Sequence, residues 1–216
     1  MSDPTHRSDH PDVDVDVDLD LDLVPGDPPV PITVWRTPAA SPTGMSDRLA
    51  ARLLAAYSRR GDAVHDATGD AGFARAVTAG GRRPLAGAGR SGDPAGLAAL
   101  VLTGWPLPEG GIDPVIVLGA LRRRLRPGGV LVAVVANPTP GAGPVEAGPL
   151  VHAAAHARLS YLQHIVAVTA ATDGDQITPT TAGDVGSRQP RRDGGRHLRV
   201  HTDLLVFTPR AGDRHA

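Results

Sequence analysis

The stretch that decides the fold is "AVHDATGDAGFARA", residues 63–76, where a short apolar run ends at Asp66 and a glycine-bearing loop leads into a helical pattern. The pattern predicts a strand over 63–65 and a helix over 71–79 that Gly80 and Gly81 end. A strand, a tight loop and a helix in this order are typical of an α/β protein with parallel strands. The same residues also fit a simple tight turn in a chain rich in Gly and Ala.

The segments on either side of this stretch continue the alternation of helix and strand. Upstream, "GMSDRLAARLLAAYSRRGD" predicts a helix that Ser46 caps, with Leu49, Leu53 and Leu54 on its apolar face. Downstream, "LAALVLTGW" (97–105) and "VLVAVVAN" (130–137) are apolar runs typical of strands buried on both faces of a parallel sheet. The remaining predictions are a helix over 114–126, a turn at "PGG" (127–129), a helix over 148–162, and strands over 163–171 and 198–209.

These elements predict one folded body of the α/β class. The sheet is expected to be mostly parallel with helices on both faces, and the last two strands, which have no helix between them, to pair as an antiparallel hairpin. A chain of 216 residues suits one domain with tails. Its start lacks the basic and apolar pattern of a signal peptide, and no apolar run approaches the ~18 residues of a membrane span, so we expect a cytoplasmic protein.

Composition excludes several kinds of chemistry. The chain contains no cysteine, so disulfides, thiolate metal sites and cysteine nucleophiles are ruled out. No G-x-S-x-G motif supports a serine hydrolase. His152 and His156 have the i, i+4 spacing of a helical metal site, but no third ligand accompanies them, so we predict no metal and interpret them as a pair on a helix surface.

Charge is divided unevenly along the chain. Residues 1–30 hold nine Asp and one Arg, whereas the remainder holds 21 Arg against 14 acidic residues, a balance of about +7. The segment "DVDVDVDLDLDL" (12–23) alternates as a strand would, but its row of like charges and the prolines that follow favour a disordered acidic arm. A second reading makes the arm a nucleic-acid mimic that shields a basic groove. The basic body is compatible with nucleic acid or with ordinary solubility charge.

Two further motifs bear on ligand binding. "GAGRSG" matches G-x-G-x-x-G at Gly87, Gly89 and Gly92, but it lacks the preceding strand and following helix that a dinucleotide site needs. A flexible, Arg-rich loop is predicted over 172–196, where Arg side chains would contact phosphates or simply be solvated. The Arg residues proposed for nucleic acid are Arg188, Arg191, Arg192 and Arg196.

In their order, these segments resemble the class I S-adenosylmethionine-dependent methyltransferases, and among them the bacterial DNA methylases that modify the exocyclic amine of adenine or cytosine. The likeness runs from about Val34 to Pro209 through "VWRTPAASPTGMSDRLAARLLAAYSRRGDAVHDATGDAG", "GGRRPLAG", "LRPGGVLVAVVAN", "LSYLQHIVAV" and "HTDLLVF". It implies a Rossmann-like methyltransferase domain over 31–210, between the arm of residues 1–30 and a tail of residues 211–216.

The resemblance also implies a cofactor site and a catalytic segment. Asp66, Gly69, Asp70 and Gly72 match the loop that holds S-adenosylmethionine, although Asp70 occupies the place of a usual glycine. Ala88 stands where the family has an acid for the ribose, and Asp93 is the nearest substitute.

The family's catalytic motif, a polar residue followed by Pro-Pro and an aromatic that stacks on a flipped base, corresponds to "TGWPLP". Only Pro106 is kept in register, so Thr103 would supply the polar acceptor and Trp105 the stacking ring. Trp105 and the prolines could equally cap a strand. The implied activity is methylation of nucleic acid, and the alternatives are a catalytically degenerate binding module and a small-molecule methyltransferase.

Overall fold

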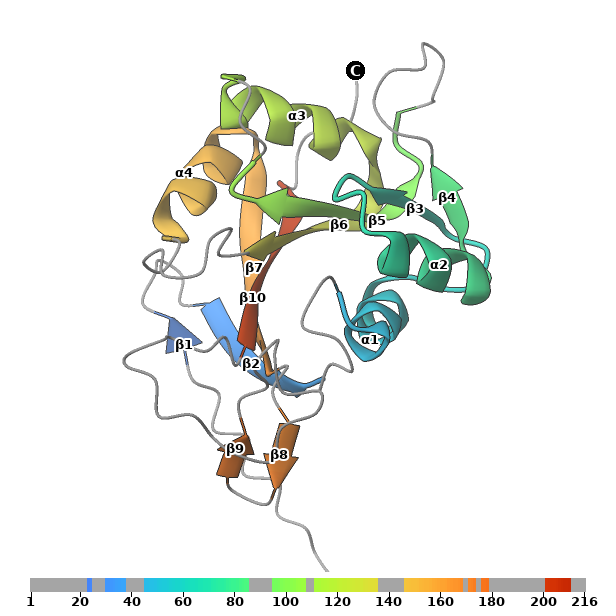
Figure 1. The fold of residues 1–216 in the computed structure, drawn as a ribbon. Helices are drawn as coiled ribbons and strands as arrows, with labels where there is room; N and C mark the ends of the chain where they lie inside the picture. Colours follow the sequence, from blue (N-terminus) through green and yellow to red (C-terminus); the bar gives the residue numbers. More distant parts are fainter. Residues whose placement is uncertain are drawn as a thin grey trace, which may run out of the picture.

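The computed structural model describes residues 30–37, 45–85, 95–107, 111–135, 146–168 and 201–210 in full, and the backbone of residues 23–24, 171–173 and 176–178. Its centre is an eight-stranded sheet in the order β1-β2-β7-β10-β6-β5-β3-β4 (Figure 1). The strands are β1 (Leu23–Val24), β2 (Val30–Arg36), β3 (Ala63–Asp66), β4 (Arg83–Leu85), β5 (Ala98–Trp105), β6 (Leu125–Val135), β7 (Leu159–Val168) and β10 (His201–Pro209). The helices are α1 (Asp47–Tyr57), α2 (Ala71–Ala79), α3 (Pro114–Arg124) and α4 (Gly148–His156).

Strand direction confirms the predicted fold class. Strands β4, β3, β5 and β6 pair in parallel, and so do β2 and β7. Strand β10 lies between β6 and β7 and is antiparallel to both, which places the predicted closing hairpin inside the sheet. The architecture is a Rossmann-like α/β fold, with a mostly parallel sheet and one antiparallel strand inside it.

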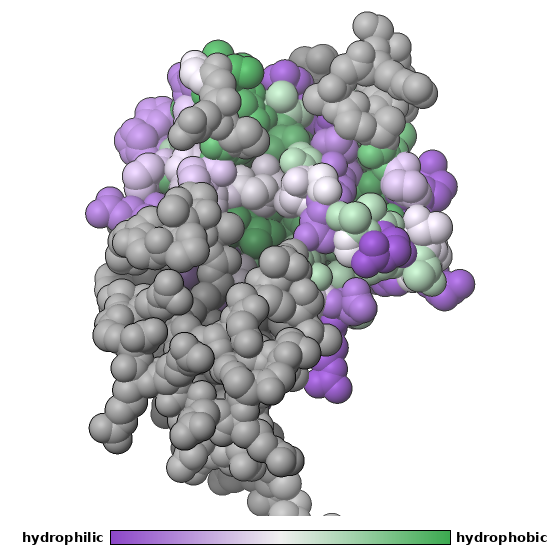
Figure 2. All heavy atoms as spheres, in the orientation of Figure 1, coloured by the Kyte–Doolittle hydropathy of each residue, from purple (hydrophilic) through white to green (hydrophobic). Residues whose placement is uncertain are grey.

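Two hydrophobic layers cover the two faces of the sheet. Helices α3 and α4 close one face and α1 and α2 the other (Figure 1). Successive residues of β5 alternate between the layers, since Val101 belongs to the first and Leu100 and Leu102 to the second. This alternation explains the unbroken apolar run, because a strand covered on both faces needs apolar side chains at every position. Figure 2 shows an apolar area over α3. Ile116 in α3 and Ile112 just before it are each 64% exposed.

The helices α1 and α2, which precede and follow β3 in the chain, begin at the residues that the sequence predicts. Ser46 caps α1 by accepting from the amide of Leu49 at 3.1 Å. Helix α2 spans 71–79 as predicted, and Leu49, Leu53 and Leu54 are buried. None of the helices in the described part of the chain is long and apolar enough to cross a membrane.

Strand β2 was not predicted, although it is one of the longer strands. Its sequence, "VPITVWR", begins in a proline-rich context that obscures the alternation. A polar chain of contacts secures β2 to the sheet and to α1. The Tyr57 hydroxyl donates to Gln163 Oε1 at 2.9 Å, and Gln163 Nε2 donates to Thr33 Oγ1 at 2.7 Å. Burial raises the pKa of Tyr57 to about 12, so this hydroxyl keeps its proton at neutral pH.

The "PGG" segment forms a bulge inside β6, and the prediction of a separate turn before the strand was wrong. Ala98 pairs with Leu125 while Leu100 pairs with Val130, so β6 holds extra residues opposite β5. Helix α3 consequently ends at Arg124, two residues earlier than predicted. The residues "PGG" resemble a turn when the sequence is considered alone, but pairing of β6 with β5 includes them in the strand.

Two glycines make this bulge possible. Gly128 has φ +75°, in the left-handed region that L side chains rarely adopt. A Cβ on Gly129 would lie 2.6 Å from the carbonyl oxygen of Ala98, closer than real Cβ contacts. The bulge therefore packs its backbone directly against the start of β5.

Helix α4 is shorter than the predicted helix over 148–162. It ends at His156, Arg158 adopts φ +61°, and β7 begins at Leu159. Leu159, Ser160 and Tyr161 pair with β10, where Phe207 lies opposite Tyr161. Their sequence fits helix and strand alike, and the pairing with β10 decides in favour of the strand.

The two segments predicted to be irregular each contain short strands. Leu23 and Val24, at the end of the acidic arm, pair with Pro31 and Val30 of β2. Strands β8 (Ala171–Asp173) and β9 (Gln176–Thr178) form a small antiparallel hairpin at the start of the Arg-rich segment. Residues 1–22, 179–200 and 211–216 lie outside the described residues, so the predicted disorder, flexible loop and tail stay predictions.

Candidate functional site

The candidate site lies at the carboxyl edge of the sheet. The parallel strands all end at this edge, and three of the connections that leave it are long: 86–97 after β4, 136–147 after β6 and 169–200 around the β8–β9 hairpin. At the opposite edge the connections are short, such as 58–62 before β3 and 80–82 before β4. In open α/β sheets, ligands bind at the carboxyl edge, where loops are free to vary.

A relay of hydrogen bonds orders the loop after β3. Asp66 Oδ1 accepts from the amide of Thr68 at 2.9 Å and from its hydroxyl at 2.6 Å. Thr68 Oγ1 in turn accepts from the amide of Asp70 at 3.1 Å. Thr68 was not singled out from the sequence, although an Asp-x-Thr-x-Asp spacing is a signal for such side-chain turns. Both of these bonds to Asp66 use Oδ1, and together they hold its carboxylate in one orientation.

Asp70 has a structural role at the start of α2. Its Oδ1 accepts from the amide of Phe73 at 2.9 Å, which caps the helix. Its Oδ2 accepts from the amide of Met45 at 2.9 Å, which ties the lead-in of α1 to the loop. Both carboxylate oxygens of Asp70 thus accept hydrogen bonds from backbone amides. This role explains why an acid stands where the methyltransferase family that the sequence resembles has a glycine.

The two glycines of the loop differ in their surroundings. Gly69 has φ +71°, and no atom lies within 4 Å of the position its Cβ would occupy, so the backbone there faces open space. A Cβ on Gly72 would lie 3.0 Å from Asp70 Oδ1 and 3.3 Å from the carbonyl oxygen of Met45. Gly69 therefore leaves room for a ligand. Gly72, which has no side chain, allows Met45, just before α1, to pack against the start of α2.

The carboxyl end of β5 lies beside this loop, since Asp66 pairs with Leu102. Gly104, two residues further on, also has no atom within 4 Å of its Cβ position. Thr103 is 3% exposed, and Trp105 is 8% exposed within the layer beneath α3 and α4. The Trp105–Pro106 peptide bond is cis. The burial of Trp105 favours a packing role over stacking on a base.

Several predicted site residues lie outside the described part of the chain. These are Asp93, Ala88, the glycines of "GAGRSG", and Arg188, Arg191, Arg192 and Arg196. Their roles stay predictions. The structure thus brings together Asp66, Gly69, Asp70, Gly72 and the end of β5, but leaves the predicted nucleic-acid contacts without a position.

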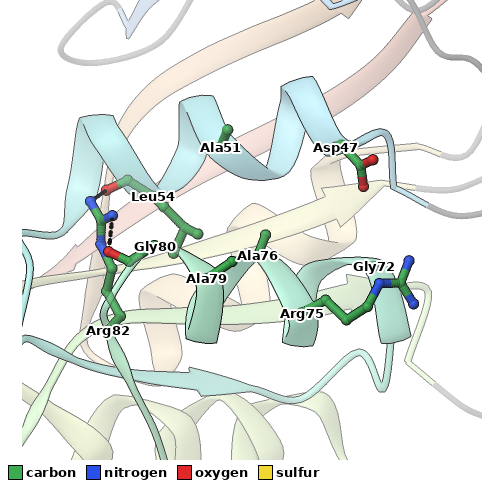
Figure 3. Close-up of a pocket in the computed structure, with 9 residues that line it drawn as sticks. All are labelled: Asp47, Ala51, Leu54, Gly72, Arg75, Ala76, Ala79, Gly80 and Arg82. Carbon is green, nitrogen blue, oxygen red and sulfur yellow. Dashed lines mark hydrogen bonds between the residues drawn. The ribbon is translucent and has the colours of Figure 1, made fainter.

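A shallow groove of about 410 Å³ runs between α1 and α2 on the outer side of these helices (Figure 3). At one end Arg82 donates to the carbonyl oxygens of Leu54, Ser58 and Gly80 at 3.1, 3.0 and 2.8 Å. Arg82 thereby caps the carboxyl ends of both helices, where a cation is stabilising. The groove shares Gly72 with the candidate site. Its walls are mainly small apolar residues together with Asp47, Arg75 and Arg82, and Arg82 is engaged by backbone, so we assign the groove no ligand.

A second polar cluster lies on β7 and β10. His164 Nε2 is 3.0 Å from Asp203 Oδ1, and His201 Nε2 is 3.6 Å from Asp203 Oδ2. The hydrogen bond with His164 lowers the pKa of Asp203. Burial acts in the opposite direction, and the charge of His201 lowers this pKa further. Burial, with Asp203 nearby, raises the pKa of Tyr161 to about 12. Within the described ranges, no group of three or more His, Asp or Glu side chains is arranged to hold a metal ion.

The lowered pKa of Asp203 predicts a pH-dependent contribution to stability. A carboxyl with a folded pKa below its unfolded value near 3.8 stabilises the fold above that value, and loses this effect as pH falls through the folded pKa. Asp203→Asn should therefore lower the free energy of unfolding at neutral pH by no more than about 1 kcal/mol, because the pair is partly exposed. Urea unfolding should show this gap shrinking towards about pH 2. A gap that persists or widens in acid would contradict the assignment, and in a His164→Ala background the gap should be smaller throughout.

Comparison with known proteins finds likeness in fold only. No family model matches the chain, and no curated protein matches it. Geranyl diphosphate methyltransferase, solved with S-adenosylmethionine, has a TM-score of 0.48 at 16% identity, covering 76% of this chain and 86% of that one. A TehB-like S-adenosylmethionine-dependent methyltransferase from Corynebacterium glutamicum has a TM-score of 0.46 at 16% identity, covering 74% and 87%. The 16S rRNA (adenine(1408)-N(1))-methyltransferase from Catenulisporales acidiphilia has a TM-score of 0.34 at 19% identity, covering 83% and 89%.

Proposed function

We propose that this protein is an S-adenosylmethionine-dependent methyltransferase with its cofactor over the β3–α2 loop. The observation that carries the proposal is the open backbone at Gly69, next to the oriented carboxylate of Asp66 at the carboxyl end of the parallel strand β3. A side chain on either Gly69 or Gly104 would project into the space that a ligand needs. The residues present therefore fit a flat, polar cofactor lying against the edge of the sheet.

Each loop residue then has a distinct part in binding. Asp66 accepts hydrogen bonds from polar groups of the cofactor, Gly69 allows its close approach, and Asp70 and Gly72 hold the loop and α1 together. Asp93 is proposed as a further contact by its place in the resembling family. When bound, the cofactor supplies an activated methyl group on its sulfonium. The protein's contribution is to orient the acceptor in line with that methyl group.

For the acceptor, we propose nucleic acid through the exocyclic amine of a base. The excess of Arg over acids in residues 31–216 supports this, with Arg188, Arg191, Arg192 and Arg196 as the proposed phosphate contacts. Thr103 and Pro106 lie at the end of β5 beside the cofactor loop and would shape the acceptor site. Trp105, assigned to stacking by the resemblance, is better assigned to packing because its ring is buried in the core.

A second candidate is a binding module that has lost the transfer reaction. It is favoured by the end of β5, where Gly104 stands at the position of the polar acceptor and Thr103 is buried. A small-molecule methyltransferase is the third candidate, and it needs the same cofactor site but no phosphate contacts.

Calorimetry with S-adenosylmethionine tests the cofactor site. We expect the wild-type chain to bind, and Asp66→Ala to bind about tenfold more weakly or worse, since a lost hydrogen bond of about 1.4 kcal/mol corresponds to tenfold in affinity. Asp62→Ala is the matched control, because Asp62 precedes the same strand at the opposite edge and pairs there with Arg126. Its pKa is lowered, chiefly by a hydrogen bond from the amide of Arg59, so it is an equally ordered carboxylate.

The outcomes separate the candidates. No binding by the wild-type chain, or equal weakening by Asp62→Ala and Asp66→Ala, would contradict the proposed cofactor site. Binding without transfer of labelled methyl to DNA, RNA or small acceptors would favour the binding module. Transfer to small acceptors alone would remove nucleic acid as the substrate class.

A further inference from the structure

Strand β2 has a free edge that is only partly paired. On its inner side β2 pairs with β7 from Ile32 to Arg36. On its outer side, among the residues that the structure describes, only Val30 and Pro31 have partners, which are Val24 and Leu23 of β1. The edge from Ile32 to Arg36 therefore presents backbone groups with no partner strand in the described part of the chain. Such an edge is a template for the addition of another strand.

The short strand β1 sets the register for whatever extends it. In an antiparallel ladder, each step back from Leu23 is matched by one step forward from Pro31. The residues before Leu23 continue the alternating segment "DVDVDVDLDLDL". We propose that residues 18–22 of the acidic arm dock on the free edge of β2 and extend β1, with Asp20 opposite Val34 and Asp18 opposite Arg36.

The alternation of the arm matches the two faces of β2 in this register. Residues directly opposite each other in a ladder share a face. Leu19 and Leu21 then lie opposite Trp35 and Thr33, on the face that α1 covers, where Trp35 is 6% exposed and Arg52 stacks on its ring at 4.8 Å. Leu19 thus extends the apolar layer that contains Trp35, and Leu21 lies beside Thr33.

The aspartates lie on the other face of β2, which is polar and accessible. Val34 is 61% exposed there, and Arg36 is exposed beside it. Asp18 opposite Arg36 forms an oppositely charged cross-strand pair, which is stabilising. Arg36 thus offsets part of the repulsion between successive aspartates, which is the argument against a strand when the arm is considered alone.

A slip of one residue would reverse this match. It would place aspartates against the buried Trp35 and leucines on the exposed face beside Arg36. The register is therefore specified by side-chain pattern as well as by the two pairs of β1. The docked arm covers an edge that would otherwise invite pairing between copies of the chain.

Disulfide formation tests the register, and the absence of native cysteine makes the test clean. In the full chain, Asp20→Cys with Val34→Cys places two cysteines directly opposite each other. Opposed residues in antiparallel ladders have Cα separations of about 4.5–5.5 Å, within the range of a disulfide. We expect an intramolecular disulfide to form under mild oxidation, detected by peptide mapping without reduction.

Two control pairs make the result specific. Leu21→Cys with Val34→Cys is slipped by one residue and points to opposite faces, and Asp14→Cys with Val34→Cys lies beyond the end of the proposed strand. Both pairs should form the disulfide roughly tenfold more slowly, since they share the same tether but not the register. Equal rates for all three pairs would overturn the proposal. Disulfides between chains would also overturn it, by showing that a second copy occupies the edge.

Hydrogen exchange supplies a second measurement without cysteine. Leu19→Asp with Leu21→Asp should raise the exchange rate of those amides between Ile32 and Arg36 that point away from β7, because the apolar face that docks the arm is lost. Val13→Asp with Val15→Asp makes the same chemical change beyond the end of β2 and should leave these amides unaffected. Unchanged exchange in the first variant would contradict docking of the arm in this register.

Discussion

Replacing Asp70 with alanine is expected to lower the free energy of unfolding by about 2 kcal/mol, more than an ordinary helix cap is worth. The reason is that one carboxylate holds two backbone amides from different segments, Phe73 in α2 and Met45 before α1. Removing it leaves both amides without this partner. Equilibrium unfolding in urea measures the change, provided that the slope with denaturant stays constant.

Two variants divide the Asp70 effect into its parts. Asp70→Asn keeps one carbonyl oxygen to cap α2 but loses the second acceptor, so we expect about half of the loss, roughly 1 kcal/mol. Ser46→Ala removes a single cap bond at the start of α1 and should also cost about 1 kcal/mol. If Asp70→Ala costs no more than Ser46→Ala, the tether to Met45 contributes nothing to stability.

The second large effect is expected at Gly129. Gly129→Ala should destabilise the fold by about 1–3 kcal/mol, because the new methyl group would lie against backbone that cannot move aside cheaply. The nearest atoms are the carbonyl oxygens of Ala98 at 2.6 Å and Arg126 at 3.0 Å. Relief requires the bulge of β6 to separate from β5, the strand that carries the acceptor side of the candidate site. Thermal or urea unfolding measures the loss.

Gly119→Ala is the matched control for this substitution. Gly119 lies inside α3, and no atom is within 4 Å of its Cβ position. The same methyl group should there stabilise the protein by about 0.5–1 kcal/mol, since alanine favours a helix over glycine. Opposite signs at the two positions are the expected result. Destabilisation of similar size at both would show that the close approach of Gly129 to β5 is not the cause.

The site was predictable to the extent that it depends on local order along the chain. Asp66 and Gly69 stand out because a strand ends and a helix begins within a few residues, which places them at the carboxyl edge of any parallel sheet. The hydrogen bond from the amide of Met45 to Asp70 could not be predicted, because the two residues are 25 positions apart and meet only when α1 packs beside α2. The burial of Trp105 could not be predicted for a similar reason, since it depends on helices α3 and α4.

The sequence by itself determined the class of the fold, the start of α1, the full extent of α2 and the buried faces of the central strands. Those features depend on caps, glycines and apolar periodicity, which act within a few residues. Tertiary structure alone decided that "PGG" is a bulge, that "LSYL" is a strand and that "VPITVWR" joins the sheet. In each case the backbone hydrogen bonds are made to a strand that is distant in the sequence, so the local pattern could not reveal them.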